Sequence, residues 1–97
     1  MYMNKTMNDP FTAKLPHLDI HGETSSTCIA VINSFIKDCL HMKEYKCVII
    51  HGRGIHGIGK GVLKETTKEY LKNDKRVSKY YIDGFNDGQT IVELKKE

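Results

Sequence analysis

The feature that most constrains this 97-residue chain is an uninterrupted apolar run, Cys-Val-Ile-Ile at residues 47–50, followed at once by His-Gly-Arg-Gly at 51–54. A short β-branched run bounded by glycine is typical of a strand buried on both faces, such as a central parallel strand. In open α/β sheets, ligands bind beyond the carboxyl ends of the strands. His51 and Arg53 are therefore predicted to lie where a site is expected.

A second strand with the same kind of ending is predicted upstream, over residues 15–20, and it leads into His21 and Gly22. A helix is predicted from Thr24 or Ser25 to about Met42, because apolar residues recur there at intervals of three and four. Its expected buried stripe is Cys28, Ile29, Ile32, Phe35, Ile36, Cys39 and Leu40. A strand, helix, strand unit of this length predicts a right-handed crossover between parallel neighbours.

The residue pattern in the second half of the chain predicts one more helix and a hairpin. The glycine-rich loop that ends near Gly61 precedes a helix running to about Asn73, expected to bury Val62, Leu63, Thr66, Tyr70 and Leu71. Strands are predicted over residues 77–82 and 89–94, joined by a six-residue turn and therefore antiparallel. The fold class is α/β, with the order β-α-β-α-β-β, a mixed four-stranded sheet and two helices. One domain is expected over residues 15–97, after a flexible lead-in over residues 1–14.

Composition narrows the class of protein. The longest apolar run is far shorter than the roughly 20 residues that a membrane helix needs, and no signal-peptide core is evident, so a cytoplasmic location is expected. The three cysteines are odd in number and lack CxxC spacing, which favours small buried side chains over a disulfide framework or a zinc site. The net charge of +3 is too small to identify a partner by itself.

Four side chains could carry chemistry at the predicted strand ends. Asp19 and His21 alternate along one strand and should share a face, where the carboxylate can orient the imidazole and raise its pKa. His51 should lie nearby on the neighbouring strand, and Arg53 offers a planar fork suited to phosphate. These residues favour acid–base work on a phosphodiester. The alternative is a surface Asp–His pair, or an aspartate that caps the next helix.

The second predicted helix has lysine at every fourth position: Lys60, Lys64, Lys68 and Lys72. Like charges at this spacing disfavour the helix, so an anionic partner would stabilise it; a solvated face is the alternative. The glycine loop before it does not match the P-loop pattern, because Lys60 is followed by Gly61 rather than by Ser or Thr. The other histidines, His17, His41 and His56, are expected to be ordinary surface residues.

Together, these motifs resemble those of a known family. Leu-Asp-Ile-His at residues 18–21 and His-Gly-Arg-Gly at 51–54 are similar to the LDxH and HGxG signatures of the small MutS-related (Smr) domain. The similarity continues through residues 61–64 and 90–94 and covers about residues 15–95, in the form of a free-standing domain. The loop before Gly61 is longer than usual in the family, and residues 85–88 lack the family's glycine cluster.

The resemblance implies a fold like the C-terminal domain of translation initiation factor three, and an endonuclease acting on RNA or DNA. It implies that Asp19 and His21 form the catalytic pair, assisted by His51. The expected phosphate-binding residues are Gly52, Arg53, Gly54, Lys60 and Lys64.

The strand-end residues leave two alternatives open. A non-catalytic module that binds nucleic acid or a ribosome is the first alternative, and an unrelated small-anion enzyme is the second. The expected partners are nucleic acid and the ribosome, with no membrane. No cofactor is required if the 2′-hydroxyl of RNA is the nucleophile, whereas a divalent metal at Asp19 is an alternative for cutting DNA.

Overall fold

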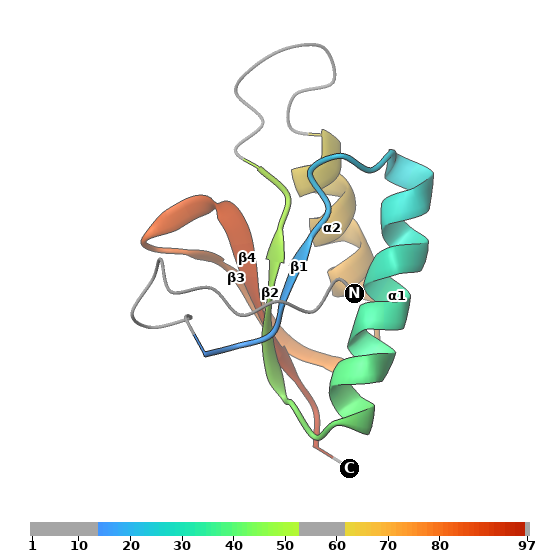
Figure 1. Cartoon of the computed structure of the whole chain (residues 1–97), viewed down its shortest axis with the longest axis vertical. Coiled ribbons are helices and arrows are strands. Elements are labelled where there is room, and N and C mark those ends of the chain that lie inside the picture. The colour runs from blue at the N-terminus through green and yellow to red at the C-terminus, as the bar shows by residue number, and fades with distance from the viewer. Residues whose placement is uncertain (1–13, 53–61, 97) are drawn as a thin grey trace.

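A computed structural model describes residues 14–52 and 62–96 of the chain. The elements are β1 (His17–Asp19), α1 (Ser25–His41), β2 (Lys46–Ile50), α2 (Val62–Asn73), β3 (Val77–Asp83) and β4 (Asn86–Leu94), as Figure 1 shows. This order confirms the predicted β-α-β-α-β-β arrangement. The predicted lead-in over residues 1–14 lies outside the described residues, apart from Lys14.

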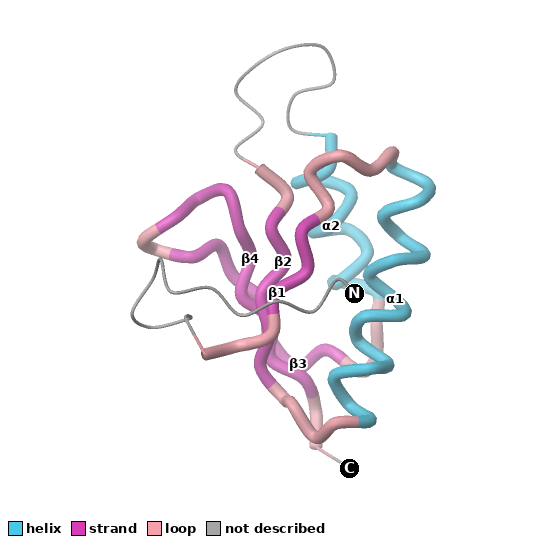
Figure 2. The backbone as a smooth tube through the Cα atoms, in the orientation of Figure 1, coloured by secondary structure: helices cyan, strands magenta, loops and turns pink. Residues whose placement is uncertain are grey.

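The four strands form one mixed sheet in the order β1-β2-β4-β3. β1 and β2 are parallel, with Leu18 opposite Ile49, and β4 is antiparallel to both β2 and β3. Both helices cover the same face of this sheet (Figures 1 and 2). Because β4 runs antiparallel to β2, the carboxyl ends of β1 and β2 and the beginning of β4 meet at one edge, which we call the carboxyl edge.

The core lies between the helices and the sheet, and β2 is its centre. Cys47, Val48 and Ile49 are all fully buried, which confirms a strand covered on both faces. All three cysteines are buried and unpaired, as predicted. A hydrogen bond with Cys39 and burial raise the pKa of the Cys47 thiol, which keeps it protonated. Neither described helix is long and apolar enough to cross a membrane.

The structure corrects part of the predicted helix stripes. Ile29 and Val62 were expected to be buried, but they are 41% and 42% exposed. Ile29 lies at the margin of the α1 stripe, against the space between the two helices, and Val62 is the first described residue of α2. In α2 the buried threonine is Thr67 rather than Thr66, because Thr67 precedes the buried Leu71 by one helical turn.

Two further expectations are wrong. The turn between the last strands has two residues rather than six, because Asp83 accepts a hydrogen bond from Phe85 N at 2.9 Å, and pairs with Asn86 across the hairpin. His17 is 2% exposed rather than on the surface, and its Nδ1 donates to Leu15 O at 2.7 Å. His41 is exposed, as predicted, and His56 lies outside the described residues.

The start of α1 is held by a capping box. Thr24 Oγ1 accepts from Thr27 N at 3.1 Å, and Thr27 Oγ1 accepts from Thr24 N at 2.9 Å. We expect Thr24→Ala to lower the free energy of unfolding by about 1 kcal/mol, because it leaves a helix amide without its acceptor. Urea denaturation measures this loss. Ser34→Ala, an exposed change within α1, is the control, and an equal loss in both variants would contradict the capping role.

Candidate active site

Backbone hydrogen bonds tie three segments together at the carboxyl edge. Ile20 N donates to Ile50 O at 2.8 Å, which holds the end of β1 against the end of β2. His51 N and Gly52 N both donate to Gly88 O, at 3.0 and 2.9 Å, which holds the end of β2 against β4. The residues that follow β1 and β2 are therefore neighbours in space, as the parallel pairing predicted.

Asp19 and His21 form a hydrogen-bonded pair at this edge. Asp19 Oδ1 accepts from both His21 N, at 3.0 Å, and His21 Nδ1, at 2.5 Å. A carboxylate can only accept, so Nδ1 carries the proton and Nε2 is the remaining titratable nitrogen. The His21 side chain is 72% exposed, and the hydrogen bond and charge of Asp19 raise its pKa. The ring is thus oriented, with its free nitrogen accessible to a substrate.

The contact between Asp19 and His21 was predicted, but its geometry differs from the prediction. β1 ends at Asp19, so His21 lies in the following turn and does not share a strand face with it. The aspartate instead closes a local turn over residues 19–21 by accepting a hydrogen bond from the amide of His21. The catalytic role assigned to this pair remains a prediction.

His51 lies at the same edge but in a different environment. It is 5% exposed, its Nδ1 donates to Gly52 O at 2.7 Å, and its Nε2 lies 2.8 Å from Thr90 Oγ1. Since the carbonyl can only accept, Nε2 is the acceptor and the threonine hydroxyl donates. Burial lowers the pKa of His51, which keeps the ring neutral. Both ring nitrogens are therefore engaged within the protein.

The side chains of Asp19 and His51 lie on opposite faces of the sheet. Side chains alternate along a strand, and Leu18 and Ile49, which are opposite each other, both belong to the core under the helices. Asp19 therefore faces away from the helices, whereas His51 faces toward them. The structure places the predicted residues at one edge, with His21 exposed at its rim and His51 beneath the helix layer.

The expected phosphate-binding residues are only partly described. Gly52 has a φ of 85°, which favours glycine, and its amide and carbonyl are paired with Gly88 and His51. A phosphate bound by the Gly52 amide would have to replace an existing hydrogen bond. Arg53, Gly54 and Lys60 lie outside the described residues.

Lys64 is the described member of the predicted phosphate set on α2. It is half-buried in the first turn of the helix, and its positive charge contributes to the lowered pKa of His51. Thr90 was part of the closing strand that resembles the family, but no role was assigned to it or to Gly88. The available signal for Thr90 was a polar residue next to the apolar pair Ile91 and Val92 in the predicted strand.

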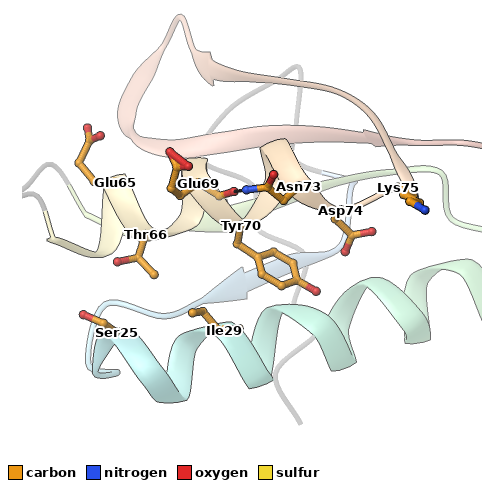
Figure 3. A pocket seen from close by; sticks show the side chains of 9 residues that line it. All are labelled: Ser25, Ile29, Glu65, Thr66, Glu69, Tyr70, Asn73, Asp74 and Lys75. Carbon is orange, nitrogen blue, oxygen red and sulfur yellow. Dashed lines mark hydrogen bonds between the residues drawn. The ribbon is translucent and has the colours of Figure 1, made fainter.

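A cavity of about 850 Å³ lies elsewhere, between α1 and α2. Figure 3 shows Tyr70 reaching from α2 toward α1, near Ile29, while Glu65 and Glu69 lie on α2 and point away from α1. None of the predicted site residues lines this cavity. Its carboxylates disfavour a phosphate ligand, so its size does not make it the candidate site.

Within residues 14–52 and 62–96, no three His, Cys, Asp or Glu side chains gather in a group that could hold a metal ion. The pair of Asp19 and His21 supplies two such donors. The divalent metal considered for DNA cutting therefore remains a hypothesis, which a chelator tests directly.

The hydrogen bond from His21 to Asp19 leads to a prediction about its titration. We expect Asp19→Asn to lower the pKa of His21 toward its ordinary value of 6.5, because the amide cannot stabilise the imidazolium by charge. An NMR titration of the His21 ring protons measures the change. Asp38→Asn, on the exposed face of α1, is the matched control. An unchanged titration in Asp19→Asn would show that the carboxylate does not hold the ring in solution.

Comparisons with known proteins agree with this architecture. A family model described as the Smr domain matches residues 18–95. Relatives named endonuclease MutS2 are 35% identical over 81 residues in Finegoldia magna and 48% identical over 81 residues in Leuconostoc mesenteroides. Each match covers 80% of this chain and 10% of the relative, so the chain spans about a tenth of their length.

Two solved structures share the fold. The Smr domain of Thermus thermophilus MutS2 superposes with a TM-score of 0.73 and 22% identity, covering 81% of this chain and 96% of that one. YdaL, a stand-alone small MutS-related protein from Escherichia coli, superposes with a TM-score of 0.75 and 21% identity, covering 82% of this chain and 64% of that one.

Proposed function

Since this chain belongs to the Smr domain family, we propose that it is an endonuclease that cleaves phosphodiester bonds in RNA or DNA, with His21 as the group that moves the proton. The observation that carries the proposal is the hydrogen bond between His21 Nδ1 and Asp19, which leaves Nε2 accessible. Similarity to relatives named endonuclease MutS2 supports the reaction class.

In the proposed reaction on RNA, neutral His21 Nε2 takes the proton of a 2′-hydroxyl. The 2′-oxygen then bonds to the adjacent phosphorus, and the bond from phosphorus to the 5′-oxygen breaks. The leaving 5′-oxygen takes a proton from water and the imidazolium returns its proton to the resulting hydroxide, so the products are a 2′,3′-cyclic phosphate and a 5′-hydroxyl. Asp19 stabilises the imidazolium while His21 holds the proton. On DNA, which lacks this hydroxyl, water is the nucleophile.

Lysines on α2 would hold the backbone of the substrate. Lys64 lies in the first turn of α2, and Lys68 follows it by one turn, so both present their charge along one side of the helix. Arg53, Gly54 and Lys60 remain predicted phosphate-binding residues on the strength of the family motifs. Binding through such contacts weakens steeply as salt concentration rises.

A second candidate function is a module that binds nucleic acid or a ribosome without cutting it. Two observations favour it: the ring nitrogens of His51 and the amide of Gly52 already have partners within the protein. In this alternative, these residues would support the shape of the edge rather than contact a reacting phosphate.

A cleavage assay separates the two functions. Single- and double-stranded RNA and DNA, each labelled at one end, are incubated with purified protein with and without a chelator, and the products are separated on denaturing gels. The endonuclease proposal expects internal cuts in at least one substrate, with a cyclic phosphate end if the substrate is RNA. If fluorescence anisotropy shows that the protein binds a substrate, but no cleavage product forms at protein excess, the endonuclease proposal is contradicted and the binding module is supported.

A further inference from the structure

A smaller cavity, of about 260 Å³, lies between α2 and the β3–β4 hairpin. We call it the tyrosine cavity. α2 contributes Lys64, Glu65 and Lys68 to its lining. The sheet contributes Tyr80, Tyr81, Ile82 and Thr90. None of the sequence motifs identified this cavity, since its walls come from parts of the chain that are distant in the sequence.

The lining of the tyrosine cavity combines aromatic rings with positive charge. Lys64 and Lys68 outnumber Glu65 in this lining, and Tyr80 faces the helices, because its register partner Val92 belongs to the core. Proteins that bind single-stranded nucleic acid use this combination, with aromatic side chains stacking on bases while lysines contact the phosphates. The charge complements a nucleotide and does not complement a cation.

The cavity shares a wall with the candidate active site. Thr90 lines the cavity, and its hydroxyl donates to His51 Nε2 at 2.8 Å. Lys64 also lines it and is close enough for its charge to act on His51. The cavity therefore adjoins the carboxyl edge on the helix-covered side of the sheet, where His51 lies.

We propose that the tyrosine cavity binds one unpaired nucleotide of the nucleic acid strand that the carboxyl edge holds. The inference rests on the proposed function and adds a substrate class to it, namely single strands or unpaired segments. The volume of about 260 Å³ lies just below the roughly 300 Å³ at which small-molecule sites begin, which suits one base and part of its sugar. A base-paired nucleotide keeps its base stacked inside the duplex and cannot enter.

The test compares oligonucleotides that differ only in their bases. Fluorescence anisotropy measures the dissociation constant of the intact chain for a labelled single strand, for an abasic strand with the same number of phosphates, and for the corresponding duplex. We expect the single strand to bind at least about fivefold more tightly than the abasic strand, because base stacking on aromatic side chains adds to the phosphate contacts. Equal dissociation constants for these two strands would overturn the proposal.

Two pairs of variants locate the binding. Ile82→Trp fills the cavity without changing charge, and Ile29→Trp is its control, because the two isoleucines are 42% and 41% exposed. Only Ile82→Trp should remove the preference for bases. Lys68→Met should weaken binding more than Lys72→Met, since only Lys68 lines the cavity. A preference kept in Ile82→Trp, or equal effects of the lysine changes, would overturn the proposal. Thermal unfolding confirms that each variant is folded.

Gels of the same samples separate the two proposals. Cleavage product from a protein that binds the single strand and the abasic strand equally would overturn the proposal for the tyrosine cavity and leave the endonuclease proposal standing. Tighter binding of the single strand than of the abasic strand, without cleavage of any substrate, would support the proposal for the tyrosine cavity and contradict the endonuclease proposal.

Discussion

His21→Ala should reduce the rate of phosphodiester cleavage by about a hundredfold to ten-thousandfold, the contribution typical of a positioned general acid or base. The variant removes the nitrogen that moves the proton, while Asp19 and the lysines of α2 remain. Stability should change by less than about 0.5 kcal/mol, because the side chain is 72% exposed and belongs to no core contact. Initial rates on the best substrate of the cleavage assay measure the effect.

The matched control for this variant is His41→Ala, which removes another exposed histidine, from the last turn of α1. It should cleave at the rate of the intact chain. If His21→Ala retained full activity, His21 would not be the proton-transferring residue, even if the chain is an endonuclease. A parallel loss in both variants would instead indicate a contaminating nuclease or a general effect on the preparation.

His51→Ala should have the largest effect on stability among the site residues, a loss of about 2–4 kcal/mol in the free energy of unfolding. The change leaves a cavity beneath the helices and deprives the buried Thr90 hydroxyl of its acceptor. Domains of this kind are stable by only about 5–15 kcal/mol, so the loss is substantial. Urea denaturation monitored by circular dichroism measures it.

A double-mutant cycle with Thr90→Val identifies the contact responsible. Both single changes break the same hydrogen bond, so the double variant should be less destabilised than the sum of the two. Additive losses would show that the bond between Nε2 and the threonine hydroxyl does not hold in solution.

The pH dependence of stability should distinguish the two histidines. Because the pKa of His51 is lowered, the unfolded chain binds a proton before the folded chain does, and stability is lost as pH falls below about 6.5. His21 acts in the opposite sense: its pKa is raised, so the stability it adds is present at acidic pH and lost as pH rises through the folded value. Acidification from about pH 7 to about pH 5 should therefore destabilise His51→Ala less than the intact chain.

Much of the secondary structure of this protein could be predicted from the sequence, because it depends on residues that are close together in the chain. The apolar run at 47–50 predicted the central strand, and the spacing in α1 predicted a helix with one buried face. Asp19 and His21 could be paired because they are two residues apart, and a contact at that separation needs only a turn. The predicted length of the hairpin turn was wrong, since Asp83 pairs with Asn86 in the strand register and its carboxylate accepts the Phe85 amide, a contact that composition does not reveal.

Tertiary structure alone decided what depends on contacts between distant residues. His51 has a strand-end motif much like that of His21, yet it is buried under the helix layer. There the hydroxyl of Thr90, 39 residues away, donates to its Nε2, and burial lowers its pKa. The tyrosine cavity arises in the same way, from α2 packing over a hairpin that follows it. Periodicity records which face of an element is apolar. Which distant side chain meets that face is set by sheet order and register, and these exist only once the chain has folded.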